Sequence, residues 1–128
     1  MAGELNTFFS STNKLHEGKN NVRILHYTDP NNGGADWNFT GYTFACDIRR
    51  TIGGALLTSA TVTVTNAAGG EITWEITPAQ TFLITAGQPA AADVTFVMDI
   101  EGTDGSGDIS YWGSVTSGTM QREITTGS

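Results

Sequence analysis

The side chains that could do chemistry are few and scattered along the chain. His16 and His26 are the only two histidines, and neither has the spacing of a metal site or of a nucleophile paired with a base. His26 is in phase with strand-like neighbours, which predicts a satisfied strand histidine. Glu71 and Glu75 lie four apart on one strand face, but a glycosidase pair also needs a cleft and a substrate platform. The serines lack the G-x-S-x-G elbow of hydrolases. We therefore predict a protein that is not an enzyme.

A second chemistry to consider is metal binding. Asp99, Glu101, Asp104 and Asp108 crowd one hairpin, and calcium accepts oxygen ligands in flexible geometry. These carboxylates do not follow the twelve-residue calcium loop, so we expect solvated turn residues, and calcium binding stays an open alternative. The single cysteine, Cys46, excludes an intrachain disulfide and a zinc cluster. We expect it to be a small buried apolar residue, and we predict no metal and no cofactor.

Charge and hydropathy limit the partners. The chain has 6 basic and 13 acidic side chains, a formal net charge of −7, and the half from residue 65 onward holds Arg122 as its one basic residue. Such a surface repels phosphate backbones, so we expect no nucleic-acid partner. No apolar run is long enough to span a membrane, and the first residues lack the pattern of an export signal. We therefore expect no membrane partner.

The elements that must position these side chains are short strands. Two-residue alternation and glycine-rich or aspartate-rich turns predict seven strands and an antiparallel β-sandwich, over residues 22–28, 42–49, 60–65, 71–76, 93–101, 109–116 and 120–125. Only residues 77–83 read as helical, because threonine can cap a helix and proline suits its first turn. The 128 residues suit one domain. We divide it into an arm, residues 1–20, and a sandwich, residues 21–128.

The alternation also predicts which side chains are buried. The expected core residues are Phe44, Cys46, Ile48, Val62, Val64, Ile72, Trp74, Ile76, Phe96, Met98 and Ile100. Trp112 is out of phase with Tyr111 and Val115. It is either an exposed aromatic at an interface or a residue that packs against the arm, and both interpretations stay open.

The arm carries the remaining candidates for partner docking. Its apolar residues are Leu5, Phe8, Phe9 and Leu15, too few to fold alone but costly to leave in water. We expect them to dock on a neighbouring subunit, with Trp112 as a further docking candidate. The arm then loses its conformational entropy only on assembly.

Several segments, in this order, resemble small phage virion proteins. They are F-T-G-Y-T-F-A-C-D-I-R at 39–49, E-I-T-W-E-I-T-P-A-Q-T at 71–81, V-M-D-I-E-G-T-D-G-S-G at 97–107, and R-E-I-T at 122–125. The chain resembles the immunoglobulin-like domain at the N-terminus of phage upper baseplate proteins and its stand-alone relatives from tail-gene regions. The resemblance covers about residues 20–125. It departs from the family at residues 86–92, where the family has a shorter link, which puts any shared contact at that loop in doubt.

The resemblance implies an immunoglobulin-like sandwich with a structural role in the virion, assembled in the cytoplasm of the bacterial host. The expected partners are other virion proteins of the tail, baseplate or fibre, joined in multiple copies in a symmetric assembly. A capsid decoration protein is the alternative. A secreted carbohydrate-binding or adhesion module is a third, and it would require Trp37, Tyr42 and Trp112 to converge.

Overall fold

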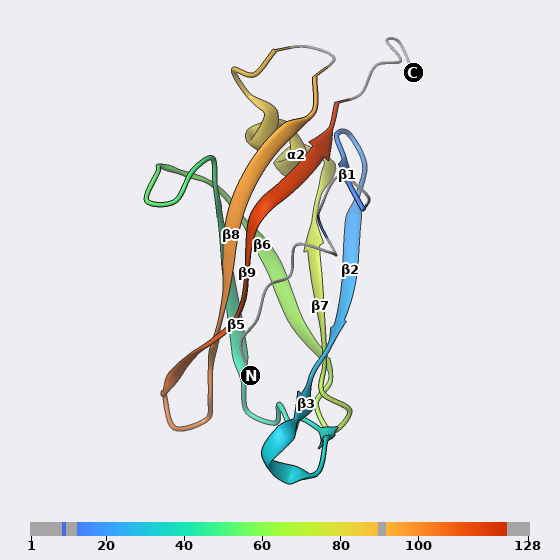
Figure 1. The fold of residues 1–128 in the computed structure, drawn as a ribbon, viewed down its shortest axis with the longest axis vertical. Helices are drawn as coiled ribbons and strands as arrows, with labels where there is room; N and C mark the ends of the chain where they lie inside the picture. The colour runs from blue at the N-terminus through green and yellow to red at the C-terminus, as the bar shows by residue number, and fades with distance from the viewer. Residues whose placement is uncertain (1–8, 10–12, 90–91, 123–128) are drawn as a thin grey trace.

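Alternating apolar and polar residues build strands that coil into one nearly barrel-shaped sheet (Figure 1). A computed structural model describes residues 9, 13–89 and 92–122. The order across the sheet is β1-β9-β8-β5-β6-β7-β2, and β3 and β4 form a separate pair. The all-β prediction is confirmed. The strands are β1 (Leu15–His16), β2 (Asn21–His26), β3 (Thr28–Asp29), β4 (Ala35–Asp36), β5 (Thr43–Arg49), β6 (Leu56–Asn66), β7 (Glu71–Ile76), β8 (Val94–Thr103) and β9 (Ile109–Gln121), with a 3₁₀ turn at Pro30–Asn32.

Strand β6 joins the two halves of the sheet. Its first part, from Leu56 to Ala60, pairs antiparallel with β5. Its second part, from Thr61 to Asn66, pairs antiparallel with β7. One long twisted strand therefore carries the sheet from the half formed by β5, β8 and β9 to the half formed by β7 and β2 (Figure 1).

The core lies between these halves and contains most of the residues that alternation predicts. Strand β7 has the expected bounds, and its apolar residues Ile72, Trp74 and Ile76 are fully buried. The burial of Cys46, Ile48, Phe96, Met98 and Ile100 is likewise confirmed, whereas Phe44, Val62 and Val64 are only partly buried and pack against the core.

Strand β9 corrects the prediction of two strands at 109–116 and 120–125. It is one strand through Gln121, and residues 123–125 lie outside the described residues. The pairing of β8 with β9 shifts register twice, between Phe96 and Met98 and between Ile100 and Glu101. Each β-bulge adds a residue to β9 without ending the strand. The bulges reverse the side-chain alternation, which in the sequence resembles a break.

The helical segment is confirmed as α2 (Pro78–Thr85). Thr77 Oγ1 accepts a 3.3 Å hydrogen bond from the Gln80 backbone, and Gln80 Oε1 accepts a 2.9 Å hydrogen bond from the Thr77 backbone. This reciprocal capping box satisfies N–H groups that have no partner within the helix. Gln80 Nε2 also donates to the Ser59 carbonyl oxygen at 2.6 Å, so the cap attaches α2 to β6.

The N-terminal residues correct the prediction of a separate docking arm. Phe9 and Leu15 are fully buried in the core. The Phe9 ring meets the Trp74 ring edge to face at 4.7 Å, and Leu15 belongs to β1, which pairs in parallel with β9. Phe9 and Leu15 pack into the core of the sheet, so they are not exposed docking residues. Leu5 and Phe8 lie outside the described residues.

The boundary at residue 20 is wrong for the same reason. Glu17 is 6% exposed, and its carboxylate lies 3.1 Å from Arg122 Nε, just beyond β9. It also accepts a hydrogen bond from the Thr85 hydroxyl in α2. Gly18 N donates to Thr81 Oγ1 at 2.9 Å. The turn between β1 and β2 is therefore tied to α2 and to the end of β9.

Trp112 is also buried, at 1% exposure, so it is not an exposed interface residue. The register shift beside Glu101 places Trp112 on the inner side of β9 while Tyr111 faces outward. Gly102 on β8 makes room for the indole, since a Cβ there would lie 2.8 Å from Trp112 Cδ1. Trp112 packs on the rings of Tyr27, Trp37, Phe39, Tyr42 and Phe44.

Candidate functional site

The carboxylates and histidines named as catalytic candidates have ordinary structural partners. Glu71 accepts a 2.9 Å hydrogen bond from Thr65, and Glu75 accepts one of 2.8 Å from Asn20. His26 Nε2 lies 2.7 Å from Asp36 Oδ1 on the solvated face of β2, so the histidine is satisfied as predicted. His16 is exposed on β1. His26 and Glu71 are direct cross-strand neighbours in the pairing of β2 with β7, whereas Glu75 lies further along β7 and His16 lies on β1.

The acidic hairpin uses Asp104 to close its own turn. Asp104 Oδ1 accepts backbone hydrogen bonds from Ser106 at 2.8 Å and from Asp108 at 3.0 Å. Such side-chain to backbone bonds stabilise tight turns. Within the described ranges, no three histidine, cysteine or carboxylate side chains are grouped so that they could hold a metal ion.

The aromatic residues that a carbohydrate platform would require do converge, with Trp37 and Tyr42 partly buried around the fully buried Trp112. The Trp37 ring lies 4.9 Å from the Trp112 ring at 72°, and the Tyr42 ring lies 6.0 Å from it at 84°. Edge-to-face rings around a buried indole stabilise a core. They do not present a flat row of faces on which a sugar could stack.

Cys46 is a buried core residue, as predicted. Its side chain is 1% exposed, and its thiol lies 3.5 Å from the Met98 sulfur. Burial raises the pKa of the Cys46 thiol from 9.0 to about 12, and the nearby carboxylates of Asp47 and Asp99 add to this shift. The thiol therefore stays protonated at neutral pH and is a poor nucleophile.

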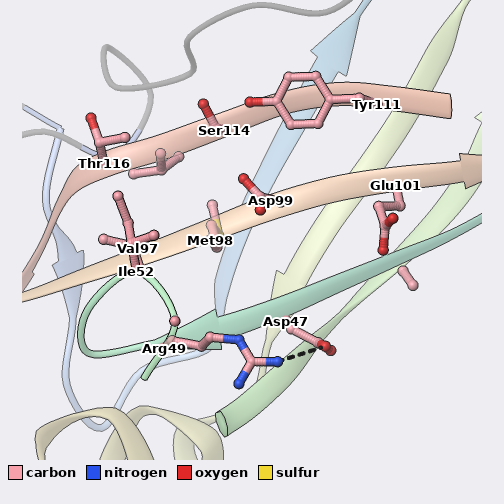
Figure 2. Close-up of a pocket in the computed structure, with 13 residues that line it drawn as sticks. Asp47, Arg49, Ile52, Val97, Met98, Asp99, Glu101, Tyr111, Ser114 and Thr116 are labelled. Carbon is pink, nitrogen blue, oxygen red and sulfur yellow. Dashed lines mark ion pairs between the residues drawn. The ribbon is translucent and has the colours of Figure 1, made fainter. Parts of the chain in front are cut away.

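A groove on the outer face of β5, β8 and β9 is the best-defined candidate site (Figure 2). Its volume is about 390 Å³. We call it the outer groove. The three strands contribute outward-facing side chains, and the β5–β6 loop adds a wall. The residues used below are Asp47, Arg49, Ile52, Val97, Asp99, Glu101 and Tyr111.

Cross-strand pairing brings the carboxylates of the outer groove together. Asp47 on β5 is directly opposite Asp99 on β8, and Asp99 is opposite Ser114 on β9. Figure 2 shows Asp99 between Ser114 and Asp47. Glu101 follows Asp99 on the same face of β8. Like charges at directly opposite positions destabilise an antiparallel pair, and Asp47 is partly compensated by a 2.8 Å hydrogen bond from the Ser59 hydroxyl and by Arg49 at 3.5 Å.

Arg49 is the cation of the outer groove, and it holds the loop in place. Its Nη1 donates to the Gly54 carbonyl oxygen at 2.8 Å, and its Nη2 lies 3.5 Å from Asp47 Oδ2. Gly54 N donates back to the Thr51 carbonyl oxygen at 2.9 Å, which closes a turn. Ile52 lies in this turn and, at 82%, is the most exposed large hydrophobic side chain among the described residues.

Sequence reasoning did not find the outer groove. Because Asp47 and Arg49 alternate with the buried Cys46 and Ile48, they lie on the outward side of their strand, but alternation does not show that Asp99 is the neighbour of Asp47. The isoleucine inside a Thr-Ile-Gly-Gly turn was the available signal. Turn positions favour small and polar residues, so a bulky aliphatic residue there is informative.

No protein-family model matches this sequence, and a search of curated proteins finds no relative with significant similarity. Among the described residues, no helix has the length and hydrophobicity to cross a membrane.

Proposed function

We propose that this protein is a non-enzymatic structural component of a phage particle, with an immunoglobulin-like fold, that docks on a larger virion protein. The resemblance to small tail-region proteins motivates the virion assignment. The outer groove carries the docking role, because it combines a rigid strand floor with an aliphatic side chain that is 82% exposed at Ile52. Exposed apolar residues next to a concave surface are typical of protein interaction sites.

The location of the site differs from the docking arm expected from the sequence. Phe9 and Leu15 are fully buried in the core, so they do not contact a partner protein. The charged side chains of the outer groove point away from the core, although the core residues Met98 and Val115 also line it. Docking without a change in fold suits a module that is copied several times in a symmetric particle.

A tail, baseplate or fibre attachment is the first choice, and capsid decoration is the alternative. Both roles need a stable domain with an accessible binding face. Particles purified from infected cells and then separated into heads and tails distinguish them. We expect antibody against this chain to detect it in intact particles and in the tail fraction. Detection in heads alone would assign it to capsid decoration, and absence from washed particles would overturn the virion proposal.

A further inference from the structure

The outer groove has an excess of negative charge that its own residues do not neutralise. Asp47, Asp99 and Glu101 contribute three carboxylates, and Arg49 contributes one guanidinium. That guanidinium already binds the Gly54 carbonyl oxygen and approaches Asp47. Asp47 and Asp99 are held as direct cross-strand neighbours. A cation brought by a partner would relieve their repulsion.

The groove also has apolar surface next to these carboxylates. Ile52 and Val97 lie together at one end, and Tyr111 lies toward the other (Figure 2). Tyr111 is 43% exposed. Small inorganic cations gain nothing from such surface, whereas aliphatic side chains gain free energy when they are buried against it.

From the charge and the apolar ends together, we infer that the outer groove binds a short extended segment of a partner protein in which lysine or arginine alternates with aliphatic residues. The basic side chains meet Asp47, Asp99 and Glu101, and the aliphatic side chains meet Ile52, Val97 and Tyr111. The volume of about 390 Å³ suits a few residues of a peptide. This inference rests on the proposed docking function and specifies the chemistry of its partner.

Three short capped peptides test the inference with the full-length protein. The first alternates lysine with valine, the second alternates lysine with glycine, and the third alternates glutamate with valine. Fluorescence anisotropy measures each affinity at low and at high salt. We expect the lysine–valine peptide to bind most tightly and to weaken as salt rises, because exposed ion pairs are screened. Equal binding of either other peptide would overturn the inference.

A charge-matched pair of variants locates the contact. Asp47→Asn combined with Asp99→Asn removes the opposed carboxylates and should weaken binding of the lysine–valine peptide about fivefold to tenfold. The control, Asp108→Asn combined with Asp36→Asn, removes the same charge from residues that do not line the groove and should change the affinity less than twofold. Equal losses in the two double variants would mean that net charge alone attracts the peptide, which contradicts a defined site.

The two proposals fail separately. If the peptide binds as expected but the chain is missing from washed particles, the virion function is wrong and the specificity of the groove stands. If the chain is present in particles but the groove variants leave the affinity for the lysine–valine peptide unchanged, the groove inference is wrong and the virion function stands.

Discussion

The Tyr27 hydroxyl donates a 2.6 Å hydrogen bond to the Trp112 carbonyl oxygen in the buried interior. Tyr27 directly follows β2, at one end of the sheet order, whereas Trp112 lies in β9, near the other end. The two rings also pack edge to face at 5.3 Å. This contact links strands that do not pair through their backbones, and it helps to close the coiled sheet.

Tyr27→Phe should therefore lower the free energy of unfolding by about 1 to 3 kcal/mol, because the Trp112 carbonyl oxygen loses its donor in a buried place. Urea denaturation followed by tryptophan fluorescence measures the change. Tyr42→Phe is the matched control, since Tyr42 is only partly buried, and it should cost less than about 0.5 kcal/mol. Equal losses would show that the Tyr27 hydrogen bond contributes nothing specific.

High pH should destabilise the fold. Burial raises the pKa of Cys46 from 9.0 to about 12, and burial, together with the charge of a Cys46 thiolate, raises the pKa of Tyr27 above its ordinary value. Both groups ionise earlier in the unfolded chain than in the folded one. Each group therefore contributes fully to the free energy of unfolding at a pH below its pKa in the unfolded chain. This contribution is lost as the pH rises toward the pKa of the group in the folded protein.

Urea denaturation at pH 8, 9, 10 and 11 checks the sign of this effect. The free energy of unfolding should fall above about pH 9, by up to about 1.4 kcal/mol per pH unit for each group. In Cys46→Ala the decline should become shallower between pH 9 and 10, whatever the absolute stability of the variant. A wild-type stability that stays constant to pH 11 would contradict the burial of both groups.

Phe9→Ala should destabilise the protein by about 3 to 5 kcal/mol, because it opens a cavity beside Trp74. Phe82→Ala is the control, since Phe82 lies on α2 and is 50% exposed.

Deleting residues 1–18 should likewise lower the melting temperature or prevent folding. A truncated protein that melts with the wild type would show that the N-terminal segment is dispensable for the fold.

Calcium and EDTA should leave the melting temperature unchanged. Asp104 Oδ1 closes its own turn, and among the described residues no three carboxylates, histidines or cysteines are grouped to hold a metal ion. A ligand that binds only the folded state stabilises it by an amount that grows with the logarithm of the ligand concentration once that concentration exceeds the dissociation constant. Differential scanning fluorimetry with millimolar calcium against EDTA measures this, and a rise of several degrees would reinstate the calcium alternative.

Local alternation predicted the parts of the fold that depend on neighbours in sequence. Residues 71–76 follow a strict two-residue period, and β7 has those bounds. The capping residues of α2 were visible for the same reason. The bulges of β9 were not visible, because a bulge depends on the partner strand β8 and reverses the very pattern that identifies a strand.

Phe9, Leu15 and Trp112 were wrongly predicted to be docking residues because burial depends on the whole chain. A count of apolar residues in the first twenty positions does not show that Phe9 reaches Trp74 or that Leu15 extends the sheet beside β9. The outer groove was not predicted from the sequence for a related reason. Asp47 and Asp99 are 52 positions apart along the chain, and only the register of β5 with β8 makes them neighbours.

Incorporation of surface variants into particles tests the central claim most directly. A phage that lacks this gene is complemented with wild type, Ile52→Asp or Ile24→Asp, and the chain is quantified in washed particles. Ile52 is 82% exposed in the outer groove, and Ile24 is 60% exposed on β2, in the other half of the sheet. Thermal melting first confirms that both variants fold. We predict that Ile52→Asp is depleted from particles while Ile24→Asp is incorporated like wild type. Normal incorporation of Ile52→Asp would contradict the account, and depletion of Ile24→Asp alone would move the docking surface to the β2 half of the sheet.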